Sequence, residues 1–310
     1  MSLPALSATV TTRADAIIEV DHVTLRFGGV TSLLDVSLVQ RRHEILSVIG
    51  PNGAGKTSLF NCVTGVYVPQ VGSITFRPEK AHPVAVVGRK PHRVNRLGIA
   101  RTFQSSRLFN ALTAFENVKV GVESRFHTGP LGAMLHVPRA RHEERRGDDR
   151  TKELLEFVGL RDRADEVASG LPYGDRRRLE IARALGTSPE LLLLDEPAAG
   201  ANPAEKAELS SLIERVRSEI GISVLLIEHD MGVVMSLADR IVVLNFGEVI
   251  AEGTPSQVQR DPAVVEAYLG AVNENGNEPQ GGAGDAGAVT PTPPEASARS
   301  GEDRPSSEER

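Results

Sequence analysis

Two parts of this chain carry short apolar runs separated by helical patterns. Residues 44–49 are nearly all apolar, which is typical of a strand buried on both faces of a parallel sheet. Similar apolar or alternating runs predict further strands at residues 17–27, 35–40, 71–76, 99–103, 191–194, 224–227, 240–244 and 248–251. Helices are expected at residues 56–64, 176–185, 203–219 and 232–238. Strands that alternate with helices indicate an α/β fold with a parallel sheet.

The middle of the chain has a different pattern. Between residues 104 and 185 strand signals vanish and helical spacing dominates, as at Leu154 and Val158. A helical subdomain, residues 104–185, is therefore expected to interrupt one α/β core made of residues 16–103 and 186–253.

Three segments around this insertion have their own character. Residues 83–96 contain prolines and are expected to form an irregular connector. Residues 126–138 are typical of a loop. The charged run 139–150 mixes both signs, which favours a solvated helix face.

The ends of the chain differ from its core. Residues 1–15 are predicted to be a flexible leader, and residues 254–272 a short helical extension. Residues 273–310 are rich in Gly, Pro, Ser and Glu with almost no large apolar side chain, so a disordered tail is expected.

Composition narrows the classes of function. The formal net charge is -6, and most of it lies in the tail, which holds eight Asp/Glu and three Arg. The rest of the chain is about neutral, which argues against nucleic acid as a partner. Cys62 is the only cysteine, so no internal disulfide is possible. No run reaches the ~18 apolar residues of a membrane span, and the start does not resemble a signal peptide.

One glycine-rich segment fits the P-loop pattern in full. It follows the apolar run 44–49 and precedes the expected helix 56–64, as the motif requires. Small residues let backbone N–H groups surround phosphates, the lysine reaches the β- and γ-phosphates, and the threonine hydroxyl ligates Mg²⁺. The predicted ATP-binding residues are Gly50, Pro51, Asn52, Gly53, Ala54, Gly55, Lys56, Thr57 and Ser58.

A second motif ends the apolar run 191–194. Asp195 and Glu196 follow it directly, where the carboxyl ends of parallel strands bind ligands. Together with the P-loop, this pair predicts Asp195 in the Mg²⁺ shell and Glu196 as the general base that polarises the attacking water.

These motifs, with their order and spacing, resemble the nucleotide-binding domain of ABC transporters over residues 16–272. The resemblance implies a P-loop NTPase fold: a RecA-like core with an antiparallel β subdomain, plus a helical ABC-specific subdomain. It also implies an ATPase that binds ATP and Mg²⁺. Phe27 resembles the aromatic residue that stacks on adenine, and Gln104 the glutamine that touches Mg²⁺ and links the core to the helical subdomain. His229 resembles the switch histidine near the γ-phosphate.

The same resemblance implies pairing between two ATPase chains. Residues 171–175 stand at the place of the family signature, so Tyr173, Gly174 and Asp175 are expected to complete the ATP site of a partner. Residues 200–203 resemble the loop that crosses to that partner. The signature usually has a small residue, often Ser or Ala, where this chain has Pro172, and this favours a heterodimer over a homodimer. His43 stands where a glycine often precedes the P-loop strand.

Finer features resemble the ATP-binding subunits of branched-chain amino-acid importers, the LivG type. The stretches that carry this are residues 98–104, 107–109, 173–174, 177–185, 195–203, 227–231, 251–255 and 267–270. The implied partners are transmembrane permease subunits, a second ATPase subunit and, indirectly, an external substrate-binding protein. The implied place is the cytoplasmic face of a prokaryotic cell membrane.

Three alternatives stay open. Importers for urea or other amides, and the ATPase of lipopolysaccharide export, share several of these stretches. A soluble ABC ATPase of DNA repair or translation is disfavoured, because residues 104–171 lack heptads and the chain has one P-loop. A protein that binds nucleotide without hydrolysis is disfavoured by Glu196, Gln104 and His229.

Overall fold

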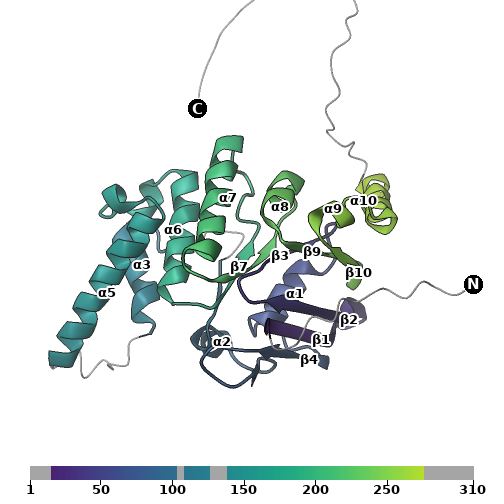
Figure 1. Ribbon diagram of the computed structural model, residues 1–310, viewed down its shortest axis with the longest axis horizontal. Helices are drawn as coiled ribbons and strands as arrows, with labels where there is room; N and C mark the ends of the chain where they lie inside the picture. The colour runs from purple at the N-terminus through teal and green to yellow at the C-terminus, as the bar shows by residue number, and fades with distance from the viewer. Residues whose placement is uncertain (1–14, 103–107, 126–137, 276–310) are drawn as a thin grey trace, which may run out of the picture.

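The computed structural model describes residues 15–102, 108–125 and 138–275. Two sheets lie next to a cluster of helices (Figure 1). Several predicted features lie outside the described residues. They are the leader at residues 1–14, Gln104, the loop at 126–137 and the tail from residue 276.

The first sheet is antiparallel, with the order β2-β1-β4-β5. Its strands are β1 (Ala16–Phe27), β2 (Val30–Arg41), β4 (Val71–Phe76) and β5 (Val84–Ala85). Gly28 and Gly29 turn β1 into β2, so the second strand begins earlier than residue 35. This sheet is the antiparallel part that the sequence predicted.

The second sheet has the order β10-β9-β3-β8-β7-β6. Its strands are β3 (Ile45–Ile49), β6 (Ile99–Arg101), β7 (Leu191–Asp195), β8 (Ser223–Ile227), β9 (Arg240–Asn245) and β10 (Glu248–Gly253). The ladders from β9 to β6 are parallel, which confirms the prediction, and β10 pairs with β9 in the antiparallel direction. β3, β7 and β8 are buried at every residue, so their apolar runs are explained by cover on both faces.

Helices cover this sheet and extend beyond it. They are α1 (Lys56–Val63), α2 (Pro91–Leu97), α7 (Pro203–Ser218), α8 (Met231–Leu237), α9 (Pro255–Val258) and α10 (Pro262–Asn275). Asn202 caps α7 through a reciprocal pair with Glu205, and Asp230 caps α8. Both helices therefore begin at the carboxyl edge of the sheet, within a residue of the predicted starts.

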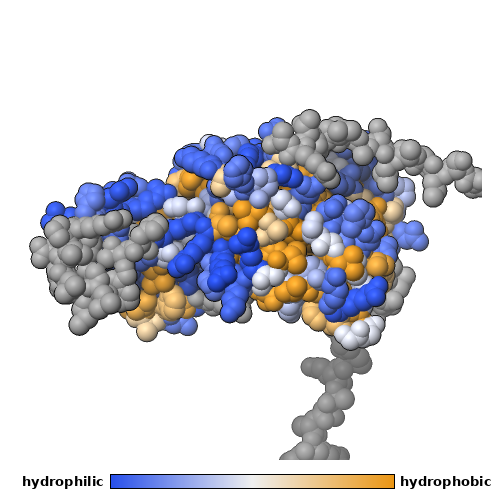
Figure 2. Space-filling model, turned by 90° about the horizontal axis from the view of Figure 1, so that it is seen from below, coloured by the Kyte–Doolittle hydropathy of each residue, from blue (hydrophilic) through white to orange (hydrophobic). Residues whose placement is uncertain are grey.

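The helical part consists of α3 (Ala114–Glu123), α5 (Pro138–Phe157), α6 (Tyr173–Gly186) and two short 3₁₀ turns (Arg161–Arg163 and Ala168–Gly170). These helices stand together at the left of Figure 1. Val118, Leu154 and Leu179 are buried in one hydrophobic cluster that continues to β7 and α7. The charged run is helical and mostly exposed where its side chains are described, as predicted. Seen from below, hydrophilic side chains lie over this end and apolar ones towards the middle (Figure 2).

Two stretches contain more regular structure than the sequence predicted. The connector at residues 83–96 contains β5 and most of α2; Pro91 occupies the first turn of α2, where its missing N–H has no helical partner in any case. The helix after the signature was expected to start near residue 176. It starts at Tyr173, because Pro172 serves as its N-cap with extended backbone angles.

His43 has a φ of 57°, a left-handed conformation that favours glycine. Its ring Nδ1 lies 2.6 Å from the Gly221 carbonyl oxygen, and its backbone N–H donates to Ser223. These bonds hold a histidine in a turn suited to glycine. Within the described residues, no helix combines the length and apolar character needed to cross a bilayer.

Candidate nucleotide-binding site

The candidate site is built at the carboxyl edge of the parallel sheet. β3 ends at Ile49, the chain turns through Gly50 to Gly55, and α1 begins at Lys56. β7, which is separated from β3 by β8, ends at the same edge with Asp195. Two buried strands thus bring the P-loop and the carboxylate pair to the same edge, as expected for an open parallel sheet.

Two glycines of the loop have no room for a side chain. A Cβ on Gly50 would lie 2.0 Å from the Leu244 carbonyl oxygen, and one on Gly55 would lie 2.6 Å from that of Ser32. Gly55 also has a φ of 102° and caps α1 without a side-chain bond. The first N–H groups of α1 therefore remain available, with the positive end of the helix dipole behind them.

Lys56 is buried and folded back onto its own loop. Its Nζ donates to the carbonyl oxygens of Gly50 at 2.6 Å and Pro51 at 2.9 Å. Burial lowers the pKa of Lys56, while the nearby charges of Glu196 and Asp195 raise it. The ammonium group therefore lies against the carbonyl oxygens of the P-loop, within electrostatic range of both carboxylates.

The hydroxyl residues that follow Lys56 differ in their surroundings. Thr57 is exposed and Ser58 is half-buried. The Ser58 hydroxyl lies 2.7 Å from that of Ser32 on β2, so it ties the start of α1 to the antiparallel sheet. Thr57 keeps an exposed hydroxyl at the position predicted for a Mg²⁺ ligand.

Asp195 makes a buried ion pair that the sequence analysis did not predict. Arg101, at the end of β6, places Nη2 2.6 Å from Asp195 Oδ2. The side chains are only 7% and 6% exposed. The order of the sheet explains the contact, since β6 and β7 are neighbours and Arg101 pairs with Leu193 in the ladder.

Glu196, Glu228 and His229 come together where β7 and β8 end. Glu196 has a φ of 48°, and its N–H donates to the Ile227 carbonyl. Oε2 of Glu196 lies 3.8 Å from His229 Nδ1. Burial raises the pKa of Glu228, although N–H groups of Ala198, Asp230 and His229 oppose that rise by donating to its carboxylate. Glu228 thus fixes the turn that carries His229.

Phe27 is exposed rather than part of the core, with 46% of its surface accessible. Its ring meets Tyr67 edge to face, with centroids 5.0 Å apart. An exposed Phe27 ring supported by a half-buried Tyr67 is suited to stack on a nucleotide base. Tyr67 is a residue that sequence reasoning missed, because only the fold brings it beside Phe27.

The signature residues lie in the first turn of α6. The Tyr173 hydroxyl donates to the Ala199 carbonyl, and the Arg177 guanidinium lies over the Tyr173 ring at 5.1 Å. Asp175 is buried, and Arg178 and Arg163 bind its carboxylate. Any contact from Asp175 to a partner's nucleotide would therefore involve its backbone. A Cβ on Gly174 would lie 3.2 Å from Glu205 Oε1, so this position is crowded.

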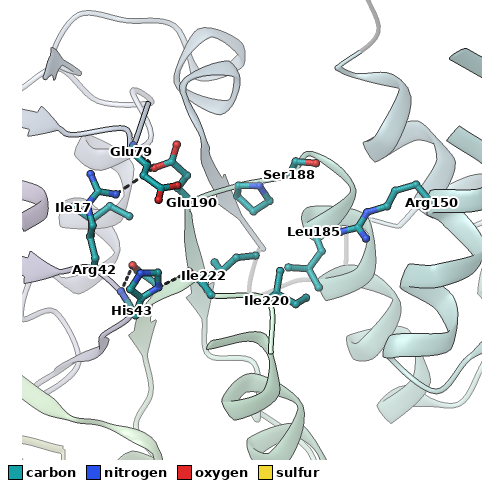
Figure 3. Close-up of a pocket in the computed structure, with 13 residues that line it drawn as sticks. Ile17, Arg42, His43, Glu79, Arg150, Leu185, Ser188, Glu190, Ile220 and Ile222 are labelled. Carbon is teal, nitrogen blue, oxygen red and sulfur yellow. Dashed lines mark hydrogen bonds and ion pairs between the residues drawn. The ribbon is translucent and has the colours of Figure 1, made fainter. Parts of the chain in front are cut away.

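A separate cavity of about 210 Å³ lies at the opposite edge of the sheet (Figure 3). Its polar groups are mostly paired with one another. Nη1 of Arg42 lies 3.4 Å from Oε2 of Glu190, and the Glu79 N–H donates to the same oxygen at 2.7 Å. The ring Nδ1 of His43 is within hydrogen-bond distance of the Gly221 carbonyl oxygen. This cavity at the amino ends of the strands holds none of the predicted site residues.

The residues present fit ATP and Mg²⁺. The loop leaves no space for side chains at Gly50 and Gly55, the Lys56 ammonium lies on the loop, and Thr57 and Asp195 carry oxygen atoms of the kind that Mg²⁺ prefers. Gln104, the third predicted ligand, lies outside the described residues.

Comparison with known proteins agrees with this geometry. A family model described as "ABC transporter" matches residues 33–199, more than half of the chain. The protein is thus an ATPase of the ABC transporter family, and the chain belongs to that family. A second model, described as "Branched-chain amino acid ATP-binding cassette transporter", matches residues 248–272.

Individual relatives show which ABC transporter ATPases this chain is similar to. The chain is 46% identical over 254 residues to the high-affinity branched-chain amino acid transport ATP-binding protein LivG of Salmonella typhimurium, covering 82% of this chain and 98% of the relative. It is 45% identical to BraF of Pseudomonas aeruginosa, a protein described in the same words, with the same coverage. The predicted resemblance is confirmed.

Solved structures confirm the predicted P-loop NTPase fold. A nucleotide-free ATP-binding cassette from an ABC transporter aligns with a TM-score of 0.70 and 29% identity, covering 82% of this chain and 98% of that one. The ADP conformation of another such cassette aligns with a TM-score of 0.70 and 30% identity, covering 82% and 99%.

Proposed function

We propose that this chain is the ATP-hydrolysing subunit of an ABC importer for branched-chain amino acids, and that it acts at the cytoplasmic face of the membrane. The observation that carries the ATPase chemistry is the arrangement at one edge of the sheet: the P-loop after β3, with Lys56 bonded to its carbonyl oxygens, and the Asp195–Glu196 pair at the end of β7. The substrate class is supported by the relatives' names and by the family match at residues 248–272.

In this proposal each polar residue has one task. Lys56 leaves the carbonyl oxygens of its loop and binds phosphate, and Thr57, Asp195 and Gln104 hold Mg²⁺. When bound, Mg²⁺ neutralises charge on the phosphate oxygens. Glu196 takes a proton from the attacking water as general base.

Two further residues bind or sense the nucleotide. Phe27, supported by Tyr67, stacks on adenine. His229 stands near the γ-phosphate, with its ring within 4 Å of Glu196.

A groove between the core and the helical part is suited to a permease. It has a volume of about 270 Å³, and its lining includes Phe109, Val120 and Arg183. Phe109 and Val120 are exposed apolar side chains, and the Arg183 guanidinium lies 5.6 Å from the Phe109 ring centroid. An apolar surface with a cationic neighbour favours a docking segment that carries an apolar side chain and a carboxylate or backbone carbonyl.

We also propose that the chain works as one of a pair of ATPases. Tyr173, Gly174 and Asp175 open α6, so the N-terminus of that helix would complete the ATP site of the other subunit. Pro172 supports a sister ATPase as this partner rather than a second copy, because a proline N-cap supplies neither a hydroxyl nor an N–H.

Reconstituted transport tests the function. The chain is assembled with its permease chains, sister ATPase and binding protein in vesicles that contain ATP, and uptake of labelled leucine is measured. ATP-dependent uptake that disappears with Glu196→Gln is expected. Uptake of urea or another amide in place of leucine, or extraction of lipopolysaccharide, would assign the chain to one of the alternative ABC systems.

A further inference from the structure

Arg101 joins the metal-binding carboxylate to the helix of the P-loop. Its Nη2 lies 2.6 Å from Asp195 Oδ2, and both side chains are almost fully buried. A buried arginine and carboxylate at this distance form a charge-assisted hydrogen bond with a defined direction. Asp195 is thereby held in one orientation.

The other side of the guanidinium is fixed by α1. Nη1 of Arg101 donates to Asn61 Oδ1 at 2.7 Å and lies 3.4 Å from Thr64 Oγ1. The guanidinium carbon also lies 5.5 Å from the centroid of the Phe60 ring, which is fully buried. Phe60 and Asn61 lie on α1 and Thr64 is its C-cap, so Arg101 connects this helix to β7.

The contact with Arg101 uses only one of the two oxygens of Asp195. Within the described residues, Oδ1 of Asp195 accepts no hydrogen bond. A carboxylate held through one oxygen presents the other in a fixed direction, and partners of this kind commonly orient metal ligands. An arginine suits this task because its planar fork binds Asp195 and Asn61 at once, which the single ammonium of lysine cannot do in the same geometry.

We propose that Arg101 is a positioning residue for Mg²⁺: it holds Asp195 by Oδ2 and leaves Oδ1 to the hydration shell of the metal. This inference rests on the proposed nucleotide and Mg²⁺ site. It predicts that loss of Arg101 weakens the binding of Mg²⁺ rather than the binding of ATP itself. An arginine that merely competed with the metal for Asp195 would have the opposite effect, since its removal would tighten Mg²⁺ binding.

The test compares nucleotide binding with and without the metal. A fluorescent ATP analogue is titrated into the purified full chain in EDTA, and then at increasing Mg²⁺ concentrations. For Arg101→Gln, the Mg²⁺ concentration that gives half of the gain in affinity should rise about 10–100-fold, the usual effect of removing such a partner. The affinity in EDTA should stay within about twofold of the wild-type value, and Arg101→Lys should lie between the two.

Loss of a buried ion pair also lowers stability, so a matched control is needed. Arg240→Gln removes the buried Arg240–Glu44 pair, 2.8 Å apart, at the opposite end of the strands. This variant should lose melting temperature without any change in its Mg²⁺ requirement. Asn61→Ala keeps the Arg101–Asp195 pair but removes the shortest bond between Arg101 and α1, so a smaller rise of the Mg²⁺ requirement is expected even if Arg101→Gln does not fold.

The outcomes separate the two proposals. A wild-type chain whose nucleotide affinity does not depend on Mg²⁺ would overturn the nucleotide–Mg²⁺ site itself. A normal wild-type response with an unchanged or lowered Mg²⁺ requirement in Arg101→Gln would overturn only the role of Arg101. If Arg101→Gln does not fold, an unchanged requirement in both Arg101→Lys and Asn61→Ala would do the same.

Discussion

Nδ1 of His229 lies 3.8 Å from Oε2 of Glu196, a separation that permits charge attraction but is too long for an ordinary hydrogen bond. The histidine side chain is 62% exposed, whereas that of Glu196 is 22% exposed. The imidazole and the Glu196 carboxylate are therefore close without an ordinary hydrogen bond between them, and the exposed imidazole has room to turn. In the proposed mechanism, Glu196 accepts the proton from the attacking water.

Glu196→Gln should keep ATP binding and slow hydrolysis about 10²–10⁴-fold, because the amide cannot act as a base. Steady-state phosphate release and nucleotide binding, measured on the same preparation, check this. Lys56→Ala is the contrasting variant, since it removes the phosphate ligand and should weaken binding itself. Near-normal turnover in Glu196→Gln would show that another group is the base.

Pro172→Ser tests the argument for two unequal ATPase subunits. A serine N-cap would add a hydroxyl and an N–H at the start of α6, and a hydrogen bond to a charged group contributes about 1.5–3 kcal/mol. In the assembled transporter, ATP affinity at the site completed by this chain should rise. If affinity and turnover both stay the same, Pro172 is neutral and the preference for a heterodimer loses its basis.

Phe109→Asp should uncouple transport while sparing basal ATPase activity. Phe109 lies in the groove proposed for the permease, away from Lys56 and Glu196, and Arg183 is close enough to accommodate the new carboxylate. Val167→Asp, at another exposed apolar position in the helical part, is the matched control and should transport normally. Equal uptake in both variants would place the permease contact elsewhere.

Tyr268→Phe tests a link between the C-terminal extension and the P-loop. Tyr268, on α10, packs against the cluster that contains Ile49 and Val243. Burial raises the pKa of Tyr268, and the backbone N–H of Gly50 near its hydroxyl opposes that rise. Loss of the hydroxyl beside the P-loop should raise KM for ATP about 2–10-fold with little change in Tm.

Tyr268→Ala, which also removes the packing, should lower Tm as well. An unchanged KM in the phenylalanine variant would mean that the hydroxyl does not influence the loop.

Much of the fold followed from local patterns. The runs at β3, β7 and β8 are apolar because both faces of these strands are covered, and the P-loop is a contiguous motif, so neither needs a tertiary contact to be recognised. Prediction failed where a proline could either break or begin a helix. Pro91 is the first residue of α2, and Pro172 is the N-cap of α6. Only the surrounding backbone decides whether such a proline breaks a helix or begins one.

The missed parts of the site depend on contacts distant in sequence. Arg101 and Asp195 meet because β6 lies beside β7, and Tyr67 meets Phe27 only once the antiparallel sheet has formed. Asp175 is charged and stands at the place of the signature motif, yet arginines from two different segments bind its carboxylate. Sequence patterns identify residue types and spacing, but they do not show which charges become neutralised within the chain.

The bond from the Tyr173 hydroxyl to the Ala199 carbonyl has a genetic consequence. It ties the start of α6 to the loop before Asn202, so the two segments that we propose to face a partner ATPase are joined within one chain. In a heterodimer, a substitution in either segment would impair the ATP site whose P-loop is encoded by the other gene. Suppressor mutations for such defects are therefore expected in the sister ATPase gene.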